Sequence, residues 1–211
     1  MRPAAIKLLS EELSREPEFL ARFEREAKSA AALNHPNVVQ VYDYGQAKGQ
    51  YFFVMELVDG TDLSIYVKEH GKLPIATALD YCEQAVKALK FAASHAIIHR
   101  DVKPANLMLT RDGLVKVSDL GLAKKLTDDS EVTMTGVGMD SPHFLAPEQA
   151  NDAAHVDHRA DIYALGVTLL YLLTGKRPFE GASNFSVVLA HANKPLPTGI
   201  RSEEHTSELQ S

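Results

Sequence analysis

The stretch "HRDVKPANLML", residues 99–109, places a carboxylate, an ammonium group and an amide at Asp101, Lys103 and Asn106. A second carboxylate, Asp119, follows thirteen residues after Asn106, in "SDLG". Phosphoryl transfer needs such a set: a carboxylate that orients the attacking hydroxyl, a cation that offsets phosphate charge, and oxygen ligands for Mg²⁺. Taken alone, these residues also fit a polar turn that caps two strands.

Strands dominate the chain before this stretch and helices the part around and after it. Apolar residues at helical spacing predict helices over residues 16–33, 63–71, 74–95, 159–175 and 184–192. Short β-branched and aromatic runs predict strands over residues 3–9, 38–45 and 50–58. Hairpins are expected at Lys48-Gly49 and at Asp112-Gly113. This order predicts an α+β protein with two segregated lobes.

The composition excludes several classes of protein. Of the 211 residues, 45% are hydrophobic and 24% are charged, which is typical of a globular protein with a real core. The net charge of −6 argues against a nucleic-acid partner. The single cysteine, Cys82, excludes an internal disulfide and fits a reducing compartment. No stretch reaches the roughly 18 apolar residues of a membrane helix, so we expect a cytoplasmic domain without a membrane segment.

Six sequence blocks together resemble one known family. They are "LNHPNVV", "VMELVDG", "IIHRDVKPANLM", "SDLGLAK", "SPHFLAPEQA" and "RADIYALG". In this order and spacing they resemble the bacterial eukaryotic-like (Hanks-type) Ser/Thr protein kinases, from residue 4 to residue 200. The resemblance implies a two-lobed kinase fold that uses ATP and Mg²⁺ and phosphorylates Ser/Thr residues of protein substrates. It divides the chain into a partial N-lobe at residues 1–58 and a partial C-lobe at residues 59–200.

The resemblance gives each residue of the opening stretch a role. Asp101 becomes the catalytic base that orients the substrate hydroxyl, and Lys103 neutralises charge on the γ-phosphate. Asn106 and Asp119 become the ligands of Mg²⁺. The alternative is a nucleotide-binding pseudokinase or scaffold, supported only by Leu120, where the family usually has Phe, and by Asp140, where it usually has Gly.

Further resemblance assigns the residues that hold the phosphates and the ribose. Lys7 in "AAIK" matches the strand lysine that binds the α- and β-phosphates. Glu26 matches the helix glutamate that pairs with this lysine, and Glu24 is the alternative. Glu26 is favoured because it lies at the border of the apolar face of its helix. Asp62 falls where a polar residue usually contacts the ribose.

The adenine site is likewise assigned by resemblance. Ala5 and Met108 match the residues that enclose the base from above and below, and Met55 matches the gatekeeper. The backbone of Glu56 and Val58 is expected to hydrogen-bond to adenine. Core packing is an equally ordinary role for the two methionines.

Arg100, directly before Asp101, marks a kinase that is switched by phosphorylation of its activation loop. A phosphothreonine carries about −1.5 to −2 charges and orders a loop through paired cations. Arg100 and Lys124 match these cations, and Thr133 and Thr135 match the phosphoacceptors. The alternative is an unmodified loop that contains threonines. Ser141 matches the hydroxyl residue that steadies the catalytic base and lysine.

Two acidic residues have architectural counterparts in the family. Asp161 in "RADIYALG" matches the buried aspartate that braces the backbone of the catalytic loop. Glu148 in "APEQA" matches the glutamate that pairs with an arginine from a later helix, which this chain does not contain. His99 is expected to pack beneath the catalytic loop rather than to act as an acid or base.

Both ends of the chain depart from the family pattern. No G-x-G-x-x-G precedes Lys7, and no further helices follow residue 200. The last eleven residues, "RSEEHTSELQS" at 201–211, correspond to a translated sequencing adapter, the alternative being a natural Ser/Glu-rich tail. We therefore expect a poorly active fragment with a non-native tail. Its parent protein could carry a membrane anchor beyond this chain and form a homodimer for autophosphorylation.

Overall fold

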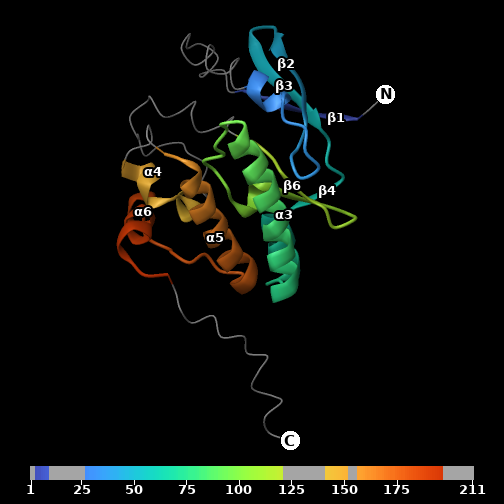
Figure 1. Cartoon of the computed structure of the whole chain (residues 1–211). Helices are drawn as coiled ribbons and strands as arrows, with labels where there is room; N and C mark the ends of the chain where they lie inside the picture. The colour runs from blue at the N-terminus through green and yellow to red at the C-terminus, as the bar shows by residue number, and fades with distance from the viewer. Residues whose placement is uncertain (1–2, 10–26, 121–140, 152–155, 197–211) are drawn as a thin grey trace, which may run out of the picture.

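Two three-stranded antiparallel sheets organise the chain. The computed structural model describes residues 3–9, 27–120, 141–151 and 156–196. The first sheet has the order β1-β3-β2, with β1 at Ala4–Leu8, β2 at Val41–Ala47 and β3 at Gln50–Glu56. The second has the order β4-β5-β6, with β4 at Gly60–Asp62, β5 at Leu107–Thr110 and β6 at Val115–Val117. Figure 1 shows the first sheet in a small upper lobe and the labelled helices in a larger lower lobe. The predicted α+β fold with two lobes is confirmed.

The upper lobe is built on the β2-β3 hairpin that the sequence predicted. Lys48 and Gly49 have φ angles of 52° and 81°, and two positive φ angles are the mark of the type I′ turn that matches strand twist. Phe53 of β3 is 2% exposed and packs with Ala27, Ala30 and Val41. Residues 27–31 are helical, as predicted for the end of the 16–33 helix, whose earlier residues lie outside the described ranges.

The lower lobe contains the remaining helices. Their bounds are α2 at Leu63–His70, α3 at Ile75–Ser94, α4 at Pro147–Asn151, α5 at His158–Thr174 and α6 at Asn184–Asn193, with 3₁₀ turns η2 at Pro104–Asn106 and η3 at Ser141–Phe144. The predicted helices over 63–71, 74–95, 159–175 and 184–192 are thus confirmed to within a residue or two.

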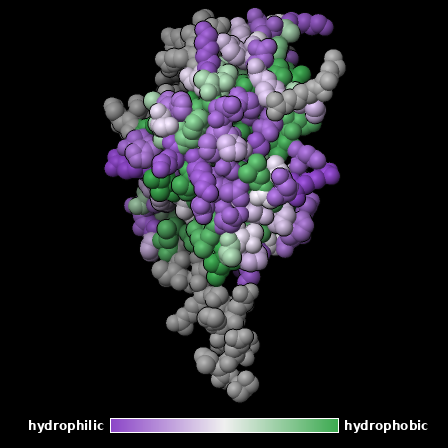
Figure 2. Space-filling model, turned by 45° about the vertical axis from the view of Figure 1, so that its right-hand side comes forward, coloured by the Kyte–Doolittle hydropathy of each residue, from purple (hydrophilic) through white to green (hydrophobic). Residues whose placement is uncertain are grey.

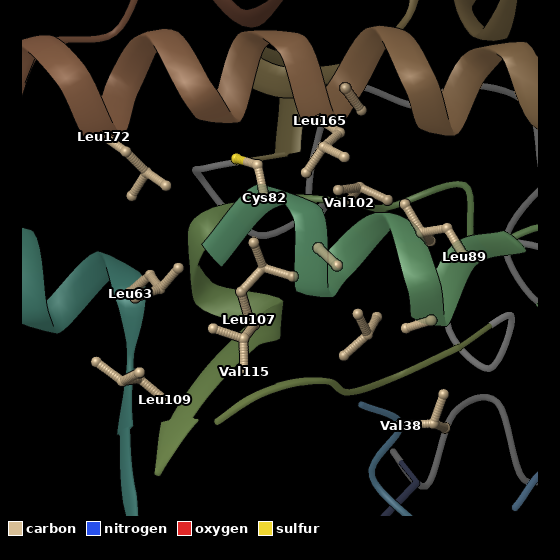
Figure 3. Packing of buried hydrophobic residues seen from close by; sticks show 14 of the residues in the cluster. Val38, Leu63, Cys82, Leu89, Val102, Leu107, Leu109, Val115, Leu165 and Leu172 are labelled. Atoms are coloured by element: carbon tan, nitrogen blue, oxygen red, sulfur yellow. The ribbon is translucent and has the colours of Figure 1, made fainter. Parts of the chain in front are cut away.

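The core of this lobe lies between α3, α5 and the second sheet (Figure 3). The buried face of α3 carries mainly small residues at helical spacing, which lets its backbone approach its neighbours; they are Ala78, Cys82, Ala85, Ala88, Leu89 and Ala92. Burial raises the pKa of the Cys82 thiol to about 11. The thiol therefore stays protonated at neutral pH and acts as a packing group.

Strand β4 is not among the strands that the sequence predicts. The reason for the strand is a close backbone approach. A Cβ atom on Gly60 would lie 2.0 Å from the carbonyl oxygen of Leu109, so only glycine lets β4 pair with β5 here. A three-residue strand of this kind depends on a partner some fifty residues later in the chain.

The two lobes are joined by backbone pairing and by ion pairs, among them Lys116–Glu56. The backbone N–H of Val39 donates to the carbonyl oxygen of Val117 at 2.9 Å. The backbone N–H of Val117 donates to the carbonyl oxygen of Asn37 at 2.8 Å. Lys116 Nζ lies 3.0 Å from Glu56 Oε1, with both side chains less than one fifth exposed. These contacts fix the upper lobe against β6.

Figure 2 shows one face of the molecule, where hydrophilic residues run down the middle and hydrophobic residues form smaller groups on either side.

A buried histidine in α6 makes stability depend on pH. His191 is 5% exposed, its Nδ1 lies 2.8 Å from the Tyr163 hydroxyl, and its ring packs edge-on against Phe179. Burial, and then the nearby His143, lower the pKa of His191 below its usual 6.5, although the backbone of His143 acts the other way. At pH values between the lowered pKa of folded His191 and 6.5, this histidine binds a proton in the unfolded chain but not in the folded chain.

We therefore expect the free energy of unfolding to fall as pH decreases from 7.5 through 6.5 towards the folded-state pKa of His191. The variant His191→Asn should be less stable at pH 7.5 but should lose less stability on acidification. Urea unfolding at pH 7.5 and 5.5 measures this difference. The control, His158→Asn, changes an exposed histidine and should keep the wild-type slope. If the free energy of unfolding of His191→Asn fell with pH as steeply as that of the wild type, His191 would not be the group responsible for the pH dependence.

Candidate active site

Asp161 holds the backbone of the stretch that opens the site. Its Oδ2 accepts a hydrogen bond from the backbone N–H of His99 at 2.9 Å, and its Oδ1 accepts one from that of Arg100 at 2.7 Å. The carboxylate lies in the first turn of α5 and is 5% exposed. Arg100 has a positive φ of 66°, a conformation that an ordinary residue keeps only when its surroundings impose it. Helix α5 thereby fixes the loop before Asp101.

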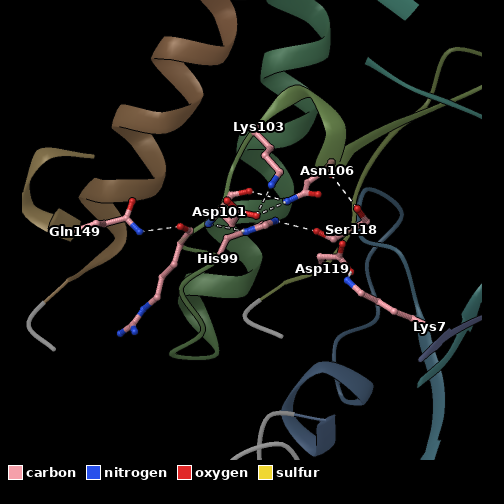
Figure 4. A network of polar contacts seen from close by, with 9 residues as sticks. Lys7, His99, Asp101, Lys103, Asn106, Ser118, Asp119 and Gln149 are labelled. Atoms are coloured by element: carbon pink, nitrogen blue, oxygen red, sulfur yellow. Dashed lines mark hydrogen bonds and ion pairs between the residues drawn. The ribbon is translucent and has the colours of Figure 1, made fainter. Parts of the chain in front are cut away.

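His99 connects the loop to the second carboxylate. Its Nε2 lies 2.9 Å from the carbonyl oxygen of Ser118, and its Nδ1 lies 3.3 Å from the backbone N–H of Asp101. A carbonyl only accepts, so Nε2 carries the proton and Nδ1 accepts from Asp101. The ring is 1% exposed and both nitrogens are engaged (Figure 4). His99 therefore holds Ser118 and Asp101 in position through its two ring nitrogens.

Asp101, Lys103 and Asn106 converge at one point. Lys103 Nζ lies 2.8 Å from Asp101 Oδ2, and both side chains are about 15% exposed. Asn106 Nδ2 donates to the Asp101 carbonyl oxygen at 2.8 Å and to Asp101 Oδ2 at 3.2 Å. The 3₁₀ turn η2 makes this convergence local, because it folds Asn106 back over Lys103. The carboxylate is held between a cation and an amide, as Figure 4 shows.

Asp119 is brought to the same region by backbone pairing. The N–H of Ser118 donates to the carbonyl oxygen of Asn106 at 2.9 Å, which places Asp119 beside the end of the catalytic loop. Asp119 has a φ of 59°, and its Oδ1 lies 2.6 Å from Lys7 Nζ on β1. Lys7 and Asp119 are 41% and 23% exposed, so this pair contributes at most about 1 kcal/mol. A phosphate or a metal ion can displace either partner at little cost.

The residues assigned to adenine lie on strands of both sheets and on the segment between them, and of these residues Met55 lines the pocket between the lobes. Ala5 lies opposite Met55 in the β1-β3 register, and Met108 lies opposite Asp62 in the β4-β5 register. Val58 lies in the short connection between the two sheets, after β3 ends at Glu56. A pocket between the lobes is lined by Met55, Asp119 and Leu120, together with apolar residues between positions 30 and 41.

Two of these residues have structural contacts that the sequence did not indicate. The Glu56 side chain pairs with Lys116, and its Oε2 accepts from the backbone N–H of Gln40 at 3.2 Å. Asp62 is the N-cap of α2, where its Oδ1 accepts from the backbone N–H groups of Ser64 and Ile65, both at 2.9 Å. A capping role was readable from an Asp directly before a helical pattern. The Glu56–Lys116 pair was not, because 60 residues separate its partners.

Gln149 is a positioning residue that the sequence reasoning missed. Its Nε2 donates to the carbonyl oxygen of Arg100 at 2.8 Å, and its Oε1 accepts from the backbone N–H of Ala146 at 3.2 Å. Arg100 is thus held at its N–H by Asp161 and at its carbonyl by Gln149. The side chain of Arg100 consequently starts from a fixed backbone position.

Several predicted residues lie outside what the structure describes. These are Glu26 with its alternative Glu24, and the activation-loop residues Lys124, Thr133, Thr135 and Asp140. For Ser141 the backbone is described, in η3, and the side chain is not. Glu148 is exposed in the first turn of α4, and Leu120 is buried in the core of the lower lobe.

The donor set suits a metal that is shared with a phosphate ligand. Within the described ranges, no three His, Cys, Asp or Glu side chains come together as a metal cage. Asn106 and Asp119 offer two oxygen-bearing side chains, and Mg²⁺ characteristically binds one or two carboxylates plus the phosphates of a substrate.

No described helix has the length and apolar character to cross a membrane.

Comparisons with known proteins agree with this geometry. Residues 1–209 match the model of the protein kinase domain. The chain is 42% identical over 215 residues to serine/threonine-protein kinase PknB of Mycobacterium leprae, and the alignment covers 100% of this chain and 34% of the relative. It is 41% identical over 200 residues to serine/threonine-protein kinase PrkC of Bacillus subtilis, and this alignment covers 95% of this chain and 31% of the relative. The chain thus spans about a third of the length of these relatives.

A solved structure shows the same architecture. The Mycobacterium tuberculosis PknI kinase domain superposes with a TM-score of 0.69 at 35% sequence identity. The alignment covers 84% of this chain and 66% of that one.

Proposed function

The chain belongs to the protein kinase family, among its bacterial Hanks-type Ser/Thr members, and on this basis we propose that it transfers the γ-phosphoryl group of ATP to Ser and Thr hydroxyls of proteins. The observation that carries the proposal is the convergence of Lys103 and Asn106 on the Asp101 carboxylate, next to Asp119. These are the groups that phosphoryl transfer requires, and catalysis of this reaction consists mainly of positioning and charge stabilisation.

In this proposal each polar residue has a defined role. Asp101 orients the substrate hydroxyl and accepts its proton, and the contact to Lys103 fixes the carboxylate while bringing positive charge to the transferring group. Asn106 keeps the carboxylate in place through Nδ2, which leaves its Oδ1 as the metal-binding atom. His99 and Asp161 hold the loop that carries these residues.

The nucleotide and the metal complete the site from both lobes. ATP would supply the phosphoryl group, and Mg²⁺, held by Asn106 and Asp119, would neutralise phosphate charge. Lys7 would exchange its weak contact with Asp119 for the α- and β-phosphates. Ala5 and Met108 would enclose adenine, with Met55 behind it, the Glu56 and Val58 backbone along its edge, and Asp62 near the ribose. The Glu56 side chain contacts Lys116 and its backbone N–H donates to the carbonyl oxygen of Gln40, so its part toward adenine would fall to its carbonyl oxygen. Asp62 caps α2 through Oδ1, so Oδ2 would be the atom that contacts the ribose.

We further propose that phosphorylation of Thr133 and Thr135 activates the site through Arg100 and Lys124. What supports this is the position of Arg100, whose backbone is tied at the N–H to Asp161 and at the carbonyl to Gln149. A phosphate that binds the Arg100 side chain would act directly on the residue preceding Asp101.

Nucleotide binding tests the cofactor part of the proposal. Lys7→Met should weaken Mg²⁺–ATP binding about tenfold or more, because a charge-assisted hydrogen bond contributes about 1.5–3 kcal/mol. Asp119→Asn should make ATP affinity nearly independent of Mg²⁺. Titration calorimetry with and without Mg²⁺ measures both effects. The control Lys90→Met removes an exposed lysine of α3 and should leave affinity unchanged. Equal affinity in Lys7→Met and Lys90→Met would contradict the assignment of Lys7.

A further inference from the structure

A pocket beside the catalytic loop differs in character from the site itself. It lies where α2, the catalytic loop, η3 and the C-terminal end of α5 meet. The residues that line it are Ser64, Lys103, Pro104, Ala105, Phe144, Tyr171 and Arg177. Because Lys103 also contacts Asp101 at 2.8 Å, the pocket begins immediately next to the proposed catalytic carboxylate.

The charged residues that line this pocket are both cations. Lys103 and Arg177 line it and no Asp or Glu is among the described lining residues, but Lys103 is paired with the neighbouring Asp101 carboxylate, so Arg177 is the main cation that faces a ligand. Arg177 is exposed, and its Nη1 lies 3.1 Å from His143 Nε2. His143 Nδ1 lies 3.0 Å from the carbonyl oxygen of Phe179 and must donate to it, so Nε2 is unprotonated and accepts from Arg177. The 9%-exposed histidine thus anchors the guanidinium at the edge of the pocket.

The remaining lining is mainly apolar. Phe144 and Tyr171 pack edge to face, with ring centroids 6.0 Å apart, and form an apolar surface. Ala105 adds only a methyl group to the lining. An apolar wall strengthens the attraction between a fixed cation and an anion, because less water screens it. A guanidinium also binds a carboxylate through two parallel hydrogen bonds, which a lysine cannot do.

We propose that this pocket binds an Asp or Glu side chain of the protein substrate and selects for acidic residues near the phosphorylated Ser or Thr. The inference rests on the proposed kinase function and names its substrate class. An extended peptide advances roughly 3.3–3.6 Å per residue, so the carboxylate belongs to a residue about two to four positions from the phosphoacceptor. A Lys or Arg at that position would meet the like charge of Arg177.

The test uses the full-length protein and three peptides that differ at one position, carrying Asp, Asn or Lys two to four residues from a single Thr. The wild-type protein should phosphorylate the Asp peptide with a kcat/KM about tenfold above the Asn peptide, mainly through KM, and should disfavour the Lys peptide. The preference should shrink as salt rises from 50 to about 500 mM, since added ions screen an exposed cation.

Arg177→Gln should reduce the Asp-to-Asn ratio to about one, whereas Lys176→Gln, which removes the adjacent exposed lysine outside the pocket, should keep the wild-type ratio. Arg177→Glu should reverse the preference and favour the Lys peptide. A new preference for the Lys peptide cannot come from misfolding of the variant. Fluorescence anisotropy of the same labelled peptides gives the ratios of Kd without requiring transfer.

The outcomes separate the inference from the proposed function. Binding ratios that follow Arg177, in a protein that transfers no phosphate, would support the acidic pocket and contradict the kinase activity. Transfer to a generic Ser/Thr protein with equal use of all three peptides would support the kinase activity and overturn the pocket. A preference that is confined to a phosphorylated residue at the same position would also overturn the assignment to carboxylates.

Discussion

Asp101→Asn is expected to reduce the rate of phosphoryl transfer to a Ser/Thr protein substrate by about a thousandfold, within the range known for loss of a general base. The amide keeps the size of the carboxylate and can still accept from Asn106 Nδ2, whose present distance to Oδ2 is 3.2 Å. It cannot take up the hydroxyl proton, and it loses the ionic contact with Lys103 at 2.8 Å. The effect should therefore fall on kcat, measured as incorporation of label from γ-labelled ATP.

Two comparisons make this result specific. The variant should bind Mg²⁺–ATP as tightly as the wild type, because the proposed metal ligands are Asn106 and Asp119. The control Asp80→Asn removes an exposed carboxylate of α3 and should retain full activity. If Asp101→Asn transferred phosphate at more than about a tenth of the wild-type rate, Asp101 would not be the base.

Asp161→Ala is expected to lower the free energy of unfolding by about 2–4 kcal/mol. Its carboxylate is 5% exposed and accepts from the N–H groups of His99 and Arg100 at 2.9 and 2.7 Å. Each buried N–H left without an acceptor costs about 1–3 kcal/mol. Asp161→Asn should recover only part of the loss, because its amide presents a donor to one of the two N–H groups. Urea unfolding followed by circular dichroism measures the change.

The control for this prediction lies on the same helix. Asp157 is the N-cap of α5 and accepts from the backbone N–H of Arg159 near the surface. Asp157→Ala should therefore cost clearly less stability than Asp161→Ala and should leave transfer almost unchanged. A loss in Asp161→Ala no greater than that in Asp157→Ala would show that the catalytic loop does not depend on this carboxylate.

The sequence predicted those parts of the fold whose cause is local. The β2-β3 hairpin followed from Lys48-Gly49, which adopt the two positive φ angles that such a turn needs. The helices followed from apolar residues at helical spacing, as on the buried face of α3. Strand β4 was missed because its three residues pair with β5 only through the bare backbone of Gly60.

The same distinction holds for the candidate site. Asp101, Lys103 and Asn106 lie within six residues, so a single turn, η2, brings them together. The Lys7–Asp119 pair joins residues 112 apart, and Gln149 reaches Arg100 across 49 residues. Such contacts depend on how the lobes and helices pack, which no local pattern specifies. The roles of Glu26, Thr133 and Thr135 stay predictions, since these residues lie outside the described ranges.

The most direct test of the central claim is to follow the label from γ-labelled ATP. The full-length protein is incubated with a Ser/Thr protein substrate, with and without Mg²⁺, and the labelled residues are identified by mass spectrometry. The account predicts Mg²⁺-dependent label on Ser and Thr of the substrate, and almost none with Asp101→Asn. Tight binding of Mg²⁺–ATP without any transfer of label would contradict it and would identify a nucleotide-binding scaffold instead.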